Sequence, residues 1–205
     1  MGFKCPLVKL IYYLLVSLLF VNCNNKEETI EPEFKLNTAD TLVDNEYQIY
    51  SLILKEQYQE ITDLVIKQRT YRFHSFSLNE STIEFIQTEV PDMDTSIFAK
   101  AIDINKLTYF LDNKFNVPNK SITLISDQEI AYLLEDISWD GFYNKYPDSN
   151  GMISFTRVGF NQDMTEAILE IGHSYGSLAA EGTLIYLTKD NNEWKIIKTI
   201  ITWVS

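Results

Sequence analysis

The sequence is poor in the residues that most often carry chemistry in small proteins. It has two cysteines, Cys5 and Cys23, and two histidines, His74 and His173. Because no cysteine follows Cys23, the rest of the chain can form neither an intramolecular disulfide nor a thiolate zinc site. The histidines lie far apart and no His-Glu-x-x-His spacing occurs, so we expect no metal site and no cofactor.

Positive charge is also scarce, with 17 Lys and Arg against 29 Asp and Glu and a formal net charge of -12. This charge opposes contact with phosphates, so we expect no nucleic-acid partner. A composition that is 45% hydrophobic and 13% aromatic is too apolar for a disordered acidic chain. We therefore expect a folded domain, and interpret carboxylate pairs such as Asp92 with Asp94 and Glu135 with Asp136 as solvated charge rather than metal ligands.

The apolar run near the N-terminus is short. Leu10 to Val21 follow the positive Lys4 and Lys9 and give way to a polar segment. Such a run rises about 18 Å as a helix, well short of the ~30 Å hydrocarbon core of a membrane. The pattern therefore predicts a signal peptide over residues 1–22 and export of the chain.

The end of this leader, Phe20-Val21-Asn22-Cys23, resembles the lipobox of bacterial lipoproteins. In that family the thiol is diacylated, the leader is cut before the cysteine, and the new amino terminus is usually acylated too. The resemblance implies a palmitate-type lipid on Cys23 and a membrane-anchored lipoprotein of the cell envelope, in the inner or the outer membrane. Phe20 and Asn22 depart from the pattern, which has Leu and a small residue there. An ordinary signal peptide and an uncleaved anchor are the alternatives.

The remaining chain divides into a polar segment and a domain. Residues 23–43 are acidic and lack an apolar period, which is typical of a tether between a lipid and a folded domain. Residues 44–205 are predicted to form a single domain, whose first half is mainly helical. Asp44 or Asn45 is suited to cap a first helix, because apolar residues follow at helical spacing.

Further elements of the first half follow from local patterns. They are a strand over 64–73, short helices between 77 and 115 broken at Pro91, a short strand at 121–125, and a helix opened by a capping box of Ser126 with Glu129.

The second half has the pattern of strands separated by turns. No connection between them is long enough for a crossover helix, so an antiparallel arrangement is predicted. The fold class is therefore α+β, with N-terminal helices followed by a C-terminal four-stranded antiparallel meander. The four predicted strands cover 152–160, 166–171, 183–188 and 194–204.

The segment Gly172-His173-Ser174-Tyr175-Gly176 fits the Gly-x-Ser-x-Gly pattern of the nucleophile elbow in α/β-hydrolases. An elbow needs a helix after the serine and a general base, and in that fold the histidine follows the serine. Here a predicted hairpin follows Ser174 and no histidine lies beyond it. We therefore predict no catalytic residue, and interpret the glycines as sites of bending or tight turning.

Three aromatic or charged features complete the predictions for single residues. The aromatic run over 139–151 fits either a core cluster or a ligand groove. Arg157 lies among apolar strand residues, so we expect it to be paired with a carboxylate or carbonyls. Trp194 and Trp203, nine positions apart on the last strand, should lie on opposite faces, one buried and one more exposed.

A second resemblance covers residues 139–205. The segments "WDGFYNKYP", "SFTRVGFN" and "WKIIKTIITWVS" are similar to those of a group of lipoproteins of the Bacteroidetes, to which no activity is assigned. The resemblance implies a shared fold and an envelope location. The expected function is that of a membrane-anchored, non-catalytic binding or interaction module, with an unspecified protein or small-ligand partner. The alternative is an envelope hydrolase that uses Ser174.

Overall fold

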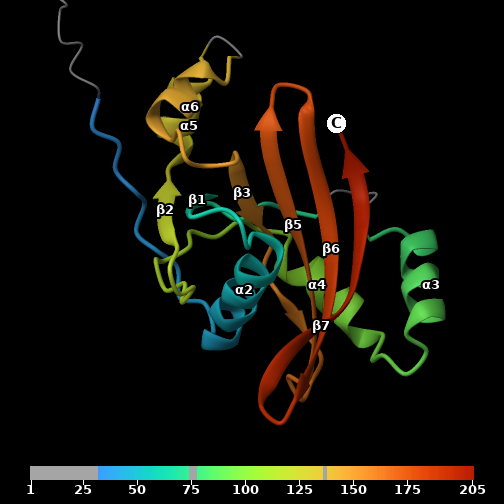
Figure 1. Cartoon of the computed structure of the whole chain (residues 1–205). Coiled ribbons are helices and arrows are strands. Elements are labelled where there is room, and N and C mark those ends of the chain that lie inside the picture. The colour runs from blue at the N-terminus through green and yellow to red at the C-terminus, as the bar shows by residue number, and fades with distance from the viewer. Residues whose placement is uncertain (1–31, 74–77, 136–137) are drawn as a thin grey trace, which may run out of the picture. The chain divides into compact units, whose positions relative to one another are not determined.

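A computed structural model describes residues 32–73, 78–135 and 138–205 (Figure 1). Phe34–Ser205 form one compact unit. The unit includes residues 34–43, which the sequence analysis assigns to the tether. Leu42 is buried there, and Asn37 exchanges two hydrogen bonds of 2.8 Å with the side chain of Gln68. The compact unit thus begins at Phe34 rather than at Asp44.

The described residues form five helices and seven strands, in an order that mixes the two. The helices are α2 (Asp44–Gln57), α3 (Glu80–Glu89), α4 (Ser96–Ile104), α5 (Asp127–Leu133) and α6 (Asp140–Lys145). The strands are β1 (Asp63–Lys67), β2 (Ser121–Ile125), β3 (Met152–Phe155), β4 (Gly159–Phe160), β5 (Glu166–Gly176), β6 (Ala179–Asp190) and β7 (Glu193–Val204).

All seven strands belong to one mixed sheet, with the order β2-β1-β3-β5-β6-β7 and with β4 also paired to β5. The α+β class is confirmed, but the four-stranded antiparallel meander is wrong. β1 pairs in parallel with both β2 and β3, so the first half of the chain extends the sheet. This parallel pairing is allowed because the connection from β1 to β2 contains α3 and α4 and is long enough for a crossover.

The predicted strand over 152–160 is interrupted. β3 and β4 both pair with β5, but Arg157 leaves the ladder and its N–H donates to the side chain of Asn105 (2.7 Å). The other three predicted strands lie within β5, β6 and β7, which are consecutive antiparallel neighbours.

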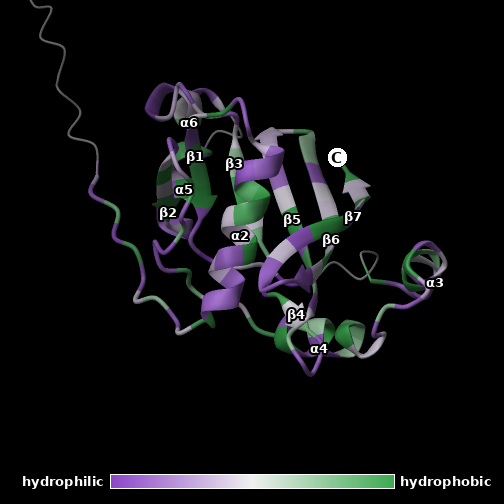
Figure 2. Cartoon of the chain, turned by 60° about the horizontal axis from the view of Figure 1, so that its bottom comes forward, coloured by the Kyte–Doolittle hydropathy of each residue, from purple (hydrophilic) through white to green (hydrophobic). Residues whose placement is uncertain are grey.

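One face of the sheet packs on α2, and we call it the α2 face. The core there joins Tyr50 and Ile53 of the helix to Ile66, Phe155 and Leu169 of three strands. Alternate residues of a strand point to opposite faces, so these side chains and their neighbours at i±2 form a continuous apolar layer. Figure 2 shows α2 in front of the sheet, with hydrophobic and hydrophilic stretches along it.

The opposite face is covered by two separate groups of helices. α3 and α4 pack on the long strands, in a cluster that includes Phe98 and Leu184. α5 and α6 pack nearer the short strands, in a cluster that includes Val65, Phe142 and Met152. Cover by separate groups leaves part of this face open, and the candidate site lies there.

The helix ends agree with the sequence in part. Ser126 caps α5, with its hydroxyl accepting from the N–H of Glu129 (3.2 Å), and Pro91 lies between α3 and α4, as predicted. Only this half of the predicted capping box is seen, because the carboxylate of Glu129 accepts from Tyr146 Oη and pairs with Lys145. The predicted cap of the first helix is wrong, because the N-cap residue is Val43, which has no side-chain bond. Asp44 instead lies in the first turn, where a negative charge complements the helix dipole.

Candidate functional site

A cavity of about 320 Å³ opens on the face of the sheet opposite α2. It has one cationic side chain, several hydroxyl groups and an apolar wall. We call it the Lys67 cavity; its lining residues are Lys67, Leu134, Trp139, Met152, Ser174, Gly176, Ser177, Ala180 and Ser205.

The floor of the cavity is set by strand register. Val65, Met152, Ser174 and Ala180 are aligned in one row across β1, β3, β5 and β6. Ser174 and Ala180 have short side chains, which leave space above the sheet there. The cavity therefore results from small residues at aligned positions.

One wall comes from Leu134, just after α5, and Trp139, just before α6. Leu134 and Trp139 pack partly buried against the α5–α6 cluster and also line the cavity. The hydroxyl of Tyr143 in α6 donates to the carbonyl of Tyr175 in β5 (2.9 Å). This hydrogen bond ties the helical wall to the strand that forms the floor.

Lys67 is the cationic residue of the cavity. It follows Val65 by two positions and so points to the same face of the sheet. Among the described residues its amino group has no hydrogen-bond or ion-pair partner, and the nearby Asp127 is paired with Arg69 (2.5 Å). Burial lowers the pKa of Lys67, an effect that the charge of Asp127 offsets only in part.

A buried carboxylate lies beside the cavity on the same face. Glu170 is fully buried, and its oxygens accept from Tyr71 Oη (2.9 Å), Thr202 Oγ1 (2.9 Å) and Trp203 Nε1 (3.3 Å). Burial, followed by the charge of Glu170, raises the pKa of Tyr71 well above its ordinary value. The three donors come from β7 and from the segment after β1, so this network holds the frame of the cavity together.

Two larger hollows lie elsewhere on the described surface. One, of about 510 Å³, runs beside α2, and the other, of about 750 Å³, lies beside α4. In the first, Lys114 pairs with Asp112 (3.5 Å), and in the second, Lys106 pairs with Asp103 (2.7 Å). Each hollow also has a second lysine, Lys55 or Lys100, which forms no ion pair among the described residues but is exposed, whereas Lys67 is partly buried.

Ser174 lies inside β5, not at a turn from a strand to a helix. The strand continues through Gly176, and the Ser177-Leu178 turn leads directly into β6. His173 is on the α2 face, where its ring contacts the carbonyl of Asn150 and packs at 5.4 Å from the ring of Tyr58. His74 lies outside the described residues. The backbone here therefore lacks the geometry of a nucleophile elbow.

Glycines of this segment lie where the strands bend, as predicted, and Gly182 has a further role in packing. A register shift lies at Gly176 and another at Gly182, as expected where strands bend. At Gly182, however, an added Cβ would lie 1.9 Å from Trp203 Nε1. Gly182 therefore gives the indole ring room to lie on β6 and reach Glu170.

The aromatic run over 139–151 is mainly core. Phe142 is fully buried, and the ring centroids of Trp139 and Tyr146 lie 5.1 and 5.3 Å from its own. Trp139 also lines the Lys67 cavity, so the groove interpretation applies to this single residue.

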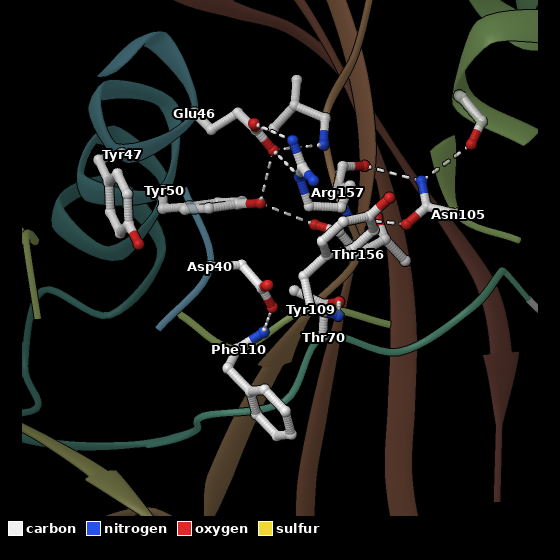
Figure 3. A network of polar contacts seen from close by, with 12 residues as sticks. Asp40, Glu46, Tyr47, Tyr50, Thr70, Asn105, Tyr109, Phe110, Thr156 and Arg157 are labelled. Atoms are coloured by element: carbon white, nitrogen blue, oxygen red, sulfur yellow. Dashed lines mark hydrogen bonds and ion pairs between the residues drawn. The ribbon is translucent and has the colours of Figure 1, made fainter. Parts of the chain in front are cut away.

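Arg157 lies at the centre of a network of polar contacts (Figure 3). Its Nε and Nη2 donate to the two carboxylate oxygens of Glu46 in α2, at 2.6 and 2.7 Å, and both side chains are buried. The hydroxyl of Tyr50 donates to the carbonyl of Thr156 (3.0 Å) and to Glu46 (3.3 Å). The predicted pairing of Arg157 is confirmed.

This network is structural. Burial alone would lower the pKa of Arg157, but the hydrogen bonds and charge of Glu46 raise it. Burial, with the charge of Glu46, also raises the pKa of Tyr50 well above its ordinary value. Arg157 and Tyr50 therefore keep fixed protonation states near neutral pH. Both oxygens of the Glu46 carboxylate already accept hydrogen bonds, so the network offers no open site to a ligand.

The two tryptophans of β7 lie as predicted. Trp194 is buried in the core of the α2 face, whereas Trp203 is half-buried on the opposite face. Between the two tryptophans, the pairing of β6 with β7 has two register shifts, and each reverses the alternation of side chains between the two faces of the sheet. Because two reversals cancel, the tryptophans still lie on opposite faces.

Several predicted features cannot be placed. Cys23, the leader over 1–22 and residues 23–31 of the tether lie outside the described residues. Within residues 32–73, 78–135 and 138–205 there is no group of three or more His, Cys, Asp or Glu side chains able to hold a metal ion. The same residues include no helix that is long and apolar enough to span a membrane.

Comparisons of the chain with protein-family models, curated proteins and solved structures gave no match.

Sequence reasoning missed Lys67. The signal was present, because Lys67 stands at an inward strand position two residues from the apolar Val65, where a lone charge is unusual. The sequence does not show which charged groups lie near Lys67 in the fold. That Lys67 has no ion-pair partner among the described residues becomes visible only when β1, β3 and β5 are side by side.

Proposed function

We propose that this protein is a membrane-anchored lipoprotein of the cell envelope whose folded domain binds a small ligand, without catalysis, in the Lys67 cavity. The observation that carries the proposal is a partly buried cation in an open cavity, with no ion-pair or hydrogen-bond partner among the described residues. Leaving a partly buried amino group unpaired costs stability. A ligand-binding role explains why such a group is present.

The size and lining of the cavity support binding of a small molecule. Its volume of about 320 Å³ lies at the lower end of the range for ligand sites. Leu134, Trp139 and Met152 supply apolar contact area, while Lys67 and the serine hydroxyls supply a few polar groups. This combination is typical of sites that bury an apolar body and orient one polar end.

The membrane anchor rests on the sequence. The leader, its lipobox-like end and the lack of any cysteine after Cys23 support lipidation there. The resemblance of residues 139–205 to Bacteroidetes lipoproteins supports an envelope location. The net charge of -12 disfavours adsorption to an anionic membrane, so an acyl anchor would be what localises the domain.

The binding role can be tested with the methionine methyl groups of the full chain, held in lipid nanodiscs. Met152 lines the cavity, whereas Met93 is buried in the cluster that α3 and α4 form with the sheet and serves as an internal control. We expect benzoate or its neutral amide, benzamide, to shift the ¹³C-methyl signal of Met152 and to leave that of Met93 in place. An unchanged Met152 signal with both compounds would contradict the proposed binding role.

A hydrolase that uses Ser174 is the second candidate. The observation in its favour is that Lys67 lines the same cavity as Ser174, since an amine of lowered pKa can serve as general base for a serine hydroxyl. A fluorophosphonate probe tests it. Labelling that is lost in Ser174→Ala and in Lys67→Met, but kept in Ser177→Ala, would support the hydrolase. No labelling of the wild type would eliminate it.

A further inference from the structure

We infer that the Lys67 cavity takes a small amphiphilic monocarboxylate, with its carboxylate at the amino group of Lys67 and its apolar body against Leu134, Trp139 and Met152. This inference rests on the proposed binding role and specifies the chemical class of the ligand.

The polar end of the ligand follows from the charge balance around Lys67. Asp127, the acidic group that acts on Lys67, is already paired with Arg69 at 2.5 Å. Glu170 has its oxygens occupied by three neutral donors and forms no ion pair with Lys67. A partly buried ammonium without an ion-pair partner is best satisfied by an anion, because a neutral ligand leaves it without a direct charge contact.

The ligand carries one negative charge rather than two. Lys67 is the single cationic residue of the lining, and neither an arginine nor a second lysine is present to share a phosphate. The protein as a whole is strongly acidic, which disfavours a dianion further. A carboxylate therefore fits the site better than a phosphate monoester.

The size of the ligand follows from the volume. At roughly 30 Å³ for each water-sized group, a cavity of about 320 Å³ holds about ten non-hydrogen atoms. Benzoate and hexanoate are close to this size. The indole of Trp139 and the thioether of Met152 are suited to contact either a ring or a short chain.

Benzoate and benzamide differ in charge but hardly in shape, so their comparison isolates the role of Lys67. The full chain in nanodiscs is titrated with each compound, and the Met152 methyl signal is followed. We expect benzoate to bind about tenfold or more tightly than benzamide, since a hydrogen bond to a charged group contributes at least that ratio. Lys67→Met should bring the ratio to about one, and Lys67→Arg should keep the preference.

Lys55→Met, on the exposed surface of α2, is the matched control and should keep the wild-type ratio. An unshifted Met93 signal shows that a variant is folded, and Lys67→Gln replaces Lys67→Met if that protein does not fold. Equal affinities of the wild type for benzoate and benzamide would overturn this inference and leave the binding role standing. Failure of both compounds to bind would instead remove the binding role itself.

Discussion

At the scale of single residues, Arg157 and Lys67 differ in how their charges are balanced. Arg157 has both carboxylate oxygens of Glu46 within 2.7 Å, and the ring of Tyr109 lies 4.3 Å below its guanidinium. Lys67 has no such partner among the described residues. The first arrangement is that of a structural ion pair, and the second is that of a group available to something outside the chain.

Replacing Arg157 should destabilise the fold strongly. In Arg157→Met, the carboxylate of Glu46 stays buried without its counter-charge, and removal of one partner from such a pair costs about 3–5 kcal/mol. For a domain of this size, that corresponds to a fall in melting temperature of roughly 10 °C. Thermal unfolding followed by circular dichroism measures it. Lys195→Met, which removes an exposed pair with Asp190, should change the midpoint little, and an unchanged midpoint in Arg157→Met would contradict a structural role.

Replacing Lys67 should have the opposite effect. Lys67→Met removes a partly desolvated charge without a partner, so we expect the melting temperature at neutral pH to rise by about 2–4 °C, equivalent to about 1 kcal/mol. Because the pKa of Lys67 is lowered in the folded state, the unfolded state binds more protons between that pKa and the ordinary value for lysine. The wild type should therefore gain stability as pH rises through this window, and the advantage of the variant should shrink.

Melting curves at pH 7 and near pH 10 test this sign, with Lys55→Met as the comparison. A lower midpoint for Lys67→Met at pH 7 would show that the fold depends on the lysine, and would remove the argument that it is kept for a ligand.

At the scale of elements, the positions of strands and helices follow from local sequence, but their pairing does not. Ser126 predicts the start of α5, and the apolar runs after residue 150 predict β5, β6 and β7. The parallel pairing of β1 with β2 and β3 depends on contacts between residues that are far apart in the chain, as between Val65 and Met152. Alternation along β1 says which residues point to each face but does not say which strand lies beside it.

The same limit explains the candidate site. Ser174 is part of a recognisable motif, and the hairpin predicted after it argues against a nucleophile elbow. Its neighbours in the cavity, Lys67 and Trp139, come from elements more than 30 residues away in the chain. Local patterns do not report such meetings, so the site could be assembled only from the register of the sheet.

The packing of β7 on β6 depends on one glycine. In Gly182→Ala, the added Cβ would lie 1.9 Å from Trp203 Nε1, so the indole must move and its hydrogen bond to Glu170 should be lost. We expect a loss of about 1–3 kcal/mol, as for other overpacked sites. One of the indole N–H signals in a ¹⁵N spectrum should shift strongly.

Gly176→Ala is the comparison for this variant. Its Cβ would lie 3.0 Å from the Cβ of Ala179 and 3.9 Å from the backbone nitrogen of the same residue, so the effect should be smaller. Equal and small effects of the two substitutions would mean that the indole of Trp203 does not rely on the space above Gly182.

At the scale of the whole molecule, the proposed lipoprotein has an acyl anchor at Cys23 and a domain with a small-ligand cavity. Acyl chains contribute about 0.8 kcal/mol for each buried CH₂, and one chain binds membranes only marginally, whereas two or three anchor a soluble domain stably. An acidic domain held in this way would stay at the membrane while its cavity remains open to solvent. Membrane location and ligand binding are separate properties of the chain, so an experiment can reject one proposal and leave the other standing.

The most direct test of the central claim is the incorporation of labelled palmitate by the full chain in a bacterial host. The wild type should carry the label and fractionate with membranes. Cys5→Ser, altered inside the leader, should behave in the same way. Cys23→Ser should lose the label and be found either soluble or uncut. Label retained by Cys23→Ser, or wild-type protein released unlabelled into the medium, would contradict the anchor and with it the assignment as an envelope lipoprotein.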